Sequence, residues 1–265
     1  MTVRFSANLG FLWTDRPLPA AIRAAGAAGF DAVECHMPYD VAAADVRAAL
    51  ASSGLAMVSL NTRMGDPAGD VGVAAIPGLE ALARAQVDEA LDYAVEIDCA
   101  SISVLAGRSR RAQGAEHTYQ ENLSYAADRA AAVGRTVLIE PMNSGVADYH
   151  LTRVDQGLET IAAVGAPNLK LMIDCFHSQM MEGDLWTVFR RAIDHVGHVQ
   201  FAAVPDRGEP DRGDVDYAQL LPAIVALGYE GTFGAEYNPR GSIEDGLRWL
   251  ERWRSQRTKA HGETE

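Results

Sequence analysis

Short apolar runs alternate with longer amphipathic segments along the whole chain. Eight runs are rich in β-branched or other apolar residues and have the length of a strand, with Gly or Pro between them and the next amphipathic segment. They span residues 3–9, 32–37, 56–61, 101–106, 136–141, 169–174, 198–203 and 232–237. Strands that alternate with helices are typical of parallel sheets, whose neighbouring strands need crossover connections.

The segments between these runs have the period of a helix. In residues 154–164, Val154, Leu158 and Ile161 recur at three- and four-residue steps and give one apolar face. Two pairs, Thr152 with Asp155 and Thr118 with Glu121, have the spacing of a capping box and predict helix starts. Glycines at the ends of five segments predict helix C-termini, and these are Gly29, Gly54, Gly134, Gly165 and Gly228.

Eight strand–helix units in a chain of 265 residues predict a (β/α)8 TIM barrel, an α/β fold in a single domain. A doubly wound sheet is the alternative. No glycine-rich phosphate turn follows the first strand, which disfavours that fold and a nucleotide cofactor. We expect the barrel over residues 1–258 and a polar C-terminal tail over residues 259–265.

Composition and charge narrow the range of partners. The formal net charge of −13 disfavours nucleic acid, whose phosphates bind clustered Lys and Arg. The sequence contains no apolar run long enough to span a membrane and no basic, apolar leader at residues 1–10, so neither membrane binding nor secretion is expected. Three cysteines without CxxC spacing predict a reduced, cytoplasmic protein.

Polar side chains occur at the C-terminal ends of several predicted strands, where TIM barrels carry their functional groups. In chain order these residues are Glu34, His36, Asn61, Arg63, Glu140, Asn143, Asp174, His177, Gln200 and Glu236. Any single one could cap a helix or pair with an arginine. A set on four consecutive strands favours a functional site. His195 and His198 are expected at the opposite end of the barrel, in structural roles.

Four of these side chains suit one chemistry. Glu140, Asp174, Gln200 and Glu236 are hard oxygen donors, which favour Mg²⁺ or Mn²⁺ over thiolate-bound zinc. Glu140 and Glu236 come from strands separated by two others and are expected on opposite faces of a small ligand. One carboxylate can then remove a proton from a carbon while the other returns it to the adjacent carbon.

With these residues in place, nearly the whole chain resembles the hydroxypyruvate isomerase family of xylose isomerase-like TIM barrels. The strings LIEPMN (138–143) and HSQMMEGDL (177–185) are the most specific parts. The resemblance implies metal-assisted interconversion of hydroxypyruvate and 2-hydroxy-3-oxopropanoate through an enediolate. It also implies that Glu140 and Glu236 are catalytic and bind the metal with Asp174 and Gln200, and that His177 contacts the substrate.

Some positions depart from the family pattern. Arg63 stands where proline is usual, Asn238 where lysine is usual and Gly208 where histidine is usual. The last two changes remove cations that could meet a substrate carboxylate. An arginine binds a carboxylate bidentately, so Arg63 and Arg207 are expected to replace them, with Asn61 and Glu34 as further contacts in the substrate site.

Several other functions remain open. A 2-oxo-tetronate isomerase or a ketose 3-epimerase would use the same two glutamates, and the string DRGEP (206–210) resembles the epimerases. A lyase or a non-catalytic subunit is a further alternative. A DNA-repair endonuclease on this barrel needs a histidine-rich zinc cluster and a basic surface, which this chain lacks. A small keto acid or sugar is therefore the expected partner, and Trp249 and Trp253 permit a homo-oligomer.

Overall fold

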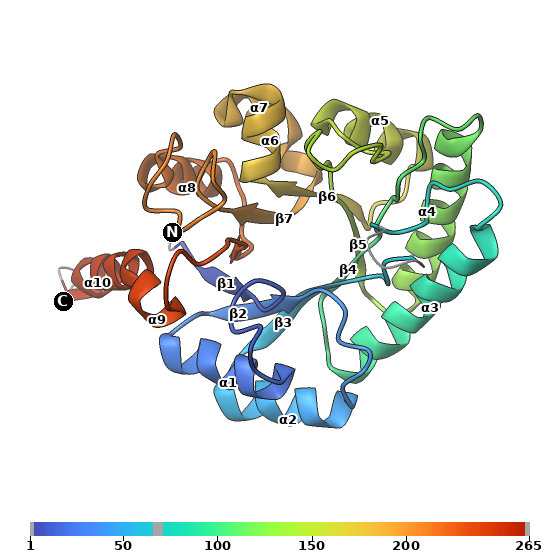
Figure 1. Ribbon diagram of the computed structural model, residues 1–265. Coiled ribbons are helices and arrows are strands. Elements are labelled where there is room, and N and C mark those ends of the chain that lie inside the picture. Colours follow the sequence, from blue (N-terminus) through green and yellow to red (C-terminus); the bar gives the residue numbers. More distant parts are fainter. Residues whose placement is uncertain (1–2, 66–70, 263–265) are drawn as a thin grey trace.

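The structure is a computed structural model that describes residues 3–65 and 71–262. Eight parallel strands form a closed barrel in which each strand pairs with the next and β8 pairs with β1 (Figure 1). The strands are β1 (Phe5–Asn8), β2 (Ala32–Cys35), β3 (Ala56–Asn61), β4 (Ser101–Ser103), β5 (Thr136–Ile139), β6 (Leu169–Asp174), β7 (Val196–Phe201) and β8 (Phe233–Ala235). The predicted TIM barrel is confirmed, and each strand overlaps its predicted run.

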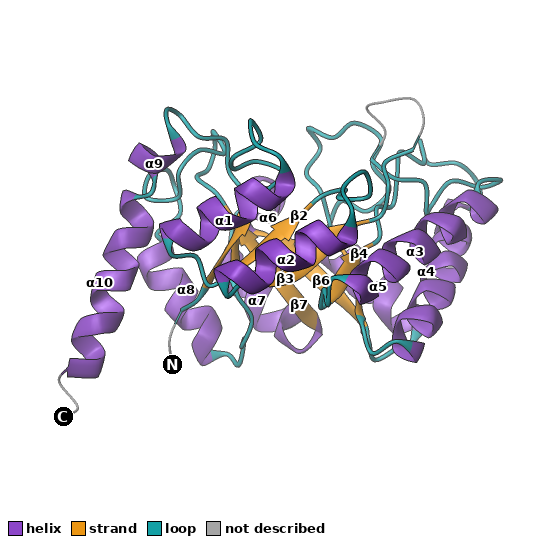
Figure 2. Cartoon of the chain, turned by 90° about the horizontal axis from the view of Figure 1, so that it is seen from below, coloured by secondary structure: helices purple, strands orange, loops and turns teal. Residues whose placement is uncertain are grey.

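Helices surround the barrel and cover its outer face (Figure 1). They are α1 (Leu18–Ala28), α2 (Ala43–Ser53), α3 (Glu80–Glu96), α4 (Ala115–Ala132), α5 (Val154–Val164), α6 (Cys175–Glu182), α7 (Leu185–Ala192), the 3₁₀ turn η1 (Ile193–His195), α8 (Tyr217–Ala226), α9 (Ile243–Gly246) and α10 (Arg248–Gly262). The long loops gather at one end of the barrel in the side view (Figure 2). Within the described residues, none of these helices is long and apolar enough to cross a membrane.

Glycines end several helices, as the sequence predicted. Gly29, Gly54 and Gly165 are the C-caps of α1, α2 and α5, each with a left-handed φ between 66° and 87°. Gly134 and Gly228 lie one residue beyond the C-caps of α4 and α8 and also have positive φ. Glycine suits these positions because it has no Cβ to clash in that conformation.

Both predicted capping boxes are wrong. Helix α4 begins at Ala115 after Gly114, which places Thr118 inside the first turn of the helix. Helix α5 begins at Val154 with Arg153 as N-cap, and the Arg153 side chain makes no capping hydrogen bond. Thr152 instead donates its backbone N–H to the Gln156 side chain, 3.1 Å away. A capping box needs its first residue at the N-cap, and these helices start elsewhere.

The last helix closes the core between the barrel and the helical layer. Trp249 is buried in α10 and contacts the rings of Phe5, Phe30 and Phe201 at centroid distances of 5.1 to 6.1 Å. Trp253, one turn later, lies 5.6 Å from Phe5. The predicted core stripe is therefore present. Helical backbone continues to Gly262, past residue 259 where the polar tail was expected to begin.

Candidate active site

The strand register places the polar side chains inside one end of the barrel. Asn8 on β1 is level with Glu34 on β2, and Asp174 on β6 is level with Gln200 on β7. Glu140 directly follows β5, and Glu236 directly follows β8. All six side chains are buried, with relative exposures of 0% to 6% in the folded chain. The site is thus shielded from solvent, where electrostatic interactions are strong.

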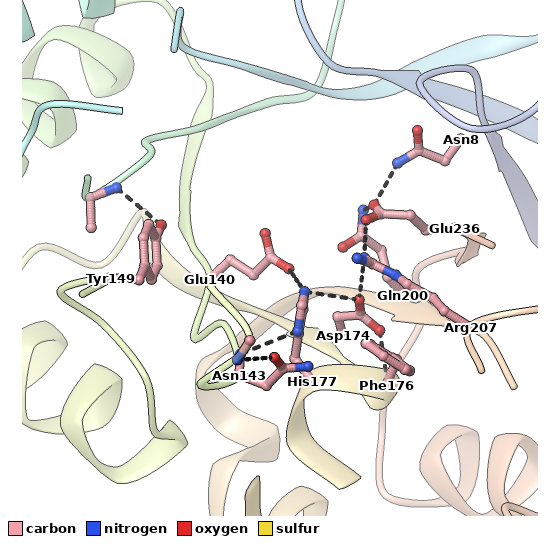
Figure 3. Close-up of polar contacts among 12 residues, drawn as sticks. Asn8, Glu140, Asn143, Tyr149, Asp174, Phe176, His177, Gln200, Arg207 and Glu236 are labelled. Atoms are coloured by element: carbon pink, nitrogen blue, oxygen red, sulfur yellow. Dashed lines mark hydrogen bonds and ion pairs between the residues drawn. The ribbon is translucent and has the colours of Figure 1, made fainter. Parts of the chain in front are cut away.

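One half of the site is a buried group of Glu140, Asp174 and His177. Ligand-type atoms of these three residues lie within 4.8 Å of one another, so that they could hold a metal ion. His177 Nε2 lies 3.8 Å from Glu140 Oε1 and 3.7 Å from Asp174 Oδ2. The other ring nitrogen, Nδ1, accepts a 3.2 Å hydrogen bond from the Asn143 backbone N–H, which fixes the ring and leaves Nε2 facing the carboxylates (Figure 3).

The other half is centred on Glu236. Its Oε2 accepts hydrogen bonds from the Asn8 Nδ2 at 2.6 Å and the Gln200 Nε2 at 2.5 Å. Its Oε1 accepts one from Arg207 Nη2, and the same guanidinium nitrogen lies 3.0 Å from Asp174 Oδ2. Arg207 therefore joins the two halves of the site (Figure 3).

Arg207 is held in place by rings and by backbone. Its guanidinium lies 4.9 Å from the ring centroid of Phe11 and 5.0 Å from that of Phe176. Its backbone N–H donates to Ala203 O at 2.9 Å, and its carbonyl accepts from the Asn238 N–H at 2.7 Å. These contacts support a residue with a φ of 55°, which is uncommon for arginine. The tight loop after β7 therefore aims the guanidinium at the two carboxylates.

The two glutamates have opposite electrostatic environments. Burial raises the pKa of Glu140 well above its ordinary value of 4.5, and the negative charges of Glu236 and Asp174 raise it further. Burial acts on Glu236 in the same direction, but the nearby His36 ring, whose Nε2 lies 4.0 Å from Glu236 Oε2, and the charge of Arg207 lower the pKa of Glu236 from 4.5 to about 2. In the absence of a cation, Glu140 therefore favours the protonated state and Glu236 the ionised state.

The donor set fits a divalent cation. Glu140 Oε1 and Gln200 Oε1 are both buried, and neither has a hydrogen-bond partner among the described residues. Buried polar atoms without partners are rare and point to an absent ligand or ion. Carboxylate and amide oxygen donors suit Mg²⁺ or Mn²⁺. Glu140, Asp174 and His177 are the residues that the geometry brings close enough to share one ion.

Comparison with known proteins decides the family. Residues 22–253 match the family described as xylose isomerase-like TIM barrel.

The chain belongs to the xylose isomerase-like TIM-barrel family.

Within this family it is an isomerase of the group that includes hydroxypyruvate and 2-oxo-tetronate isomerases. The chain is 44% identical to the 2-oxo-tetronate isomerase of Cupriavidus necator over 93% of this chain and 97% of that protein. It is 37% identical to the hydroxypyruvate isomerase of Escherichia coli over 95% and 100% of the two chains. A crystal structure from Brucella melitensis, titled as an AP endonuclease of family 2, superposes with a TM-score of 0.92 at 38% identity, covering 95% and 99%.

The remaining predicted residues of this isomerase lie away from the two halves of the site or beneath them. Arg63 makes a bidentate pair with Glu89, at 2.8 and 3.0 Å, and its guanidinium lies 4.7 Å from the ring centroid of Tyr39. Asn61 ends β3, where its carbonyl accepts a hydrogen bond from Tyr39 Oη. A substrate contact for Arg63 or Asn61 stays a prediction. Glu34 faces Asn8, Gln200 and His198 within the barrel.

Two residues of this isomerase site were missed from the sequence. Asn8 donates to Glu236, but the first strand was not searched for polar groups at its end. The string VRFSANL (3–9) carries the signal, because an asparagine lies near the end of the predicted strand. His198 was expected at the far end of the barrel. It is instead buried on β7, where Nε2 shares a hydrogen bond with Glu34.

Proposed function

We propose that this isomerase moves a proton between C2 and C3 of a short 2-oxo acid with a hydroxyl group on C3. The first candidate substrate is hydroxypyruvate, in exchange with 2-hydroxy-3-oxopropanoate. The observation that carries the proposal is the pair Glu140 and Glu236, two buried carboxylates that follow β5 and β8 in one site and that have opposite pKa shifts in the absence of a cation. Groups whose environments drive their pKa values apart are suited to act as acid and base.

The two carboxylates have complementary roles in this reaction. Ionised Glu236 removes a proton from C3 of hydroxypyruvate, and the C3–H electron pair forms the C2–C3 double bond of an enediolate. Glu140 delivers a proton to C2, while the hydroxyl proton on C3 passes to the C2 oxygen and leaves an aldehyde at C3. Carbon and oxygen are neither gained nor lost, and no external oxidant is required. The reverse reaction uses the same groups with their roles exchanged.

A divalent cation, Mg²⁺ or Mn²⁺, fits the same site. When bound, it would stabilise the negative charge on the enediolate oxygens and lower the pKa of the glutamates that hold it. Glu140 and Asp174 would hold it, with Gln200 and Glu236 as further oxygen donors from β7 and β8, and His177 would bind it through Nε2 only after giving up the Nδ1 hydrogen bond with the Asn143 N–H. Arg207 would remain beside the carboxylates, where its guanidinium can also donate a hydrogen bond to a substrate oxygen.

A 2-oxo-tetronate is the second candidate substrate, and the 44% identity to the Cupriavidus enzyme favours it. It differs from hydroxypyruvate by one hydroxymethylene unit, and the same two carbons exchange the proton. An endonuclease is disfavoured, because the chain has a formal net charge of −13 and the site is rich in carboxylates. The carboxylates of this site would repel the phosphates of DNA.

The substrate is tested by comparing kcat/KM for hydroxypyruvate, 2-oxo-tetronates and free ketoses, with Mn²⁺ added to metal-free protein. We expect turnover of one or both acids. Turnover of free ketoses alone would replace the acid isomerase with a ketose epimerase. No turnover of any substrate would contradict the proposal.

A further inference from the structure

A further buried carboxylate, that of Glu34, lies beneath the site and takes no part in the proposed proton transfer. It is 2% exposed on β2, and both oxygens are engaged by protein groups. Oε1 accepts from Asn8 Nδ2 at 3.2 Å and from Gln200 Nε2 at 3.1 Å, and Oε2 shares a hydrogen bond with His198 Nε2. A carboxylate with this many partners is suited to orient its neighbours.

Glu34 and Glu236 are bridged by two carboxamides. The side-chain nitrogens of Asn8 and Gln200 each lie between the two carboxylates and donate to both. Carboxylates only accept hydrogen bonds, so an amide group between two of them must present its NH2. The Gln200 carboxamide therefore has one orientation, with Oε1 turned away from both carboxylates. That oxygen is buried and has no hydrogen-bond partner among the residues described.

The backbone leaves room for this arrangement. Gly234 on β8 is level with Gln200 on β7. A Cβ at Gly234 would overlap the Glu34 carboxylate and would lie 3.0 Å from Gln200 Cγ. No positive φ requires glycine at this position, because Gly234 is not among the residues with left-handed backbone. The absence of a side chain therefore makes space for Glu34 and Gln200.

We propose that Glu34 is a positioning residue that fixes the Gln200 carboxamide so that Oε1 is presented to the site as a neutral oxygen donor. This inference rests on the proposed metal-assisted function. Without Glu34, the Gln200 NH2 loses one of its two carboxylate acceptors, and only the hydrogen bond to Glu236 opposes a rotation that would turn the NH2 toward the cation, which repels it. Mutation of residues that hydrogen-bond to metal ligands and orient them typically lowers metal affinity by about 10- to 100-fold.

The test is a double-mutant cycle on Mn²⁺ affinity, measured by calorimetry on metal-free protein. Glu34→Gln and Gln200→Ala are each expected to weaken Mn²⁺ binding by about 10- to 100-fold. The double variant is expected to bind no more weakly than Gln200→Ala alone, because Glu34 acts through Gln200. Activity is not needed for this measurement, so the result is independent of the substrate.

The matched control is Glu116→Gln. Glu116 also pairs with a histidine, with Oε2 3.0 Å from His150 Nε2, but it lies on α4 at the outside of the barrel. This variant is expected to bind Mn²⁺ as the wild type does. Gly234→Ala is a second route, because the added methyl group displaces Glu34 without changing its charge. It is expected to weaken Mn²⁺ binding in the same direction as Glu34→Gln.

The outcomes separate this inference from the proposed function. If the wild type binds Mn²⁺ and folded Glu34→Gln binds it equally well, the positioning role is wrong and the isomerase proposal stands. Additive losses in the cycle would overturn the positioning role as well. A wild type that binds no Mn²⁺ would overturn both the metal site and its positioning. Failure of both Glu34→Gln and Gly234→Ala to fold would make Glu34 a determinant of folding instead.

Discussion

At the scale of single residues, Glu140 and Glu236 differ only in their surroundings. Glu236 accepts hydrogen bonds from Asn8, Gln200 and Arg207, which supply the donors that an ionised carboxylate needs after burial. Glu140 Oε1 accepts none from the described residues. The same side chain is therefore stabilised as a charge at one position and destabilised at the other, so that one site holds both a base and an acid.

This difference predicts stability changes of opposite sign in metal-free protein. At neutral pH, Glu140→Gln is expected to stabilise the fold by roughly 1 to 3 kcal/mol, because it removes a buried carboxyl group whose raised pKa opposes folding above pH 4.5. Glu236→Gln is expected to destabilise it by about 3.5 kcal/mol, since the pKa is lowered from 4.5 to about 2 and each pH unit corresponds to about 1.4 kcal/mol. Thermal unfolding measures both, at about 2 to 4 °C per kcal/mol.

The pH dependence of the two variants provides the control. Burial raises the pKa of Glu140 in the folded state. The destabilisation of the folded state by Glu140 is therefore absent below the unfolded pKa of 4.5, and it grows as the pH rises from 4.5 to the folded pKa. The pKa of Glu236 is about 2 when folded, so its contribution is present above 4.5 and is lost as the pH falls toward 2. Equal shifts for both variants at every pH would contradict these environments.

At the scale of elements, Asp174 belongs to a strand and a helix at once. It is the last residue of β6 and the N-cap of α6, where Oδ1 accepts a 2.8 Å hydrogen bond from the Phe176 N–H. The helix therefore starts without a loop and places His177 one turn later on the face next to Glu140. The same carboxylate uses its other oxygen, Oδ2, to meet Arg207.

Two substitutions separate these roles of Asp174. Asparagine keeps an oxygen for the cap, whereas alanine removes it, so Asp174→Ala is expected to be less stable than Asp174→Asn by about 1 kcal/mol. Both are expected to lose Mn²⁺ binding, because neither retains the carboxylate charge. Chemical denaturation and calorimetry measure the two effects. Equal stability of the two variants would show that the cap contributes nothing.

The elements were predictable from the sequence to different degrees. The eight strands follow from apolar runs, since burial on both faces of a parallel barrel strand requires them, as in Met172 and Ile173 of β6. The capping boxes at Thr118 and Thr152 failed because spacing alone does not fix where a helix begins. Gly114, with a φ of 86°, allows α4 to start one turn earlier than the box implies.

At the scale of the whole molecule, closure of the barrel builds the site. Asn8 and Glu236 are 228 positions apart in the chain and meet only because β8 pairs with β1. Strand ends indicated that Glu140, Asp174, Gln200 and Glu236 converge, but not which pairs touch. Arg207 bridging Asp174 and Glu236, and His198 bound to Glu34, depend on loop conformation and register, which no sequence spacing reveals.

The last helix is predicted to be an integral part of this closed structure. Trp249→Ala removes a buried ring that packs on Phe5, Phe30 and Phe201, and is expected to cost about 3 to 5 kcal/mol. Trp253→Ala is the control on the same helix and is expected to cost less, because Trp253 is only half-buried. Thermal unfolding of both variants compares them. Equal and small costs would show that α10 is peripheral to the core.

The central claim is that Glu140 and Glu236 transfer a proton between neighbouring carbons of a small 2-oxo acid. The most direct measurement is proton NMR in D₂O with hydroxypyruvate or a 2-oxo-tetronate, metal-analysed protein and a protein-free blank. Wild-type protein is expected to introduce deuterium at a carbon beside the carbonyl, and Glu140→Gln and Glu236→Gln are each expected to slow this by about 100-fold or more. Deuterium incorporation at the wild-type rate in either variant, or none with metal-loaded wild type, would contradict the claim.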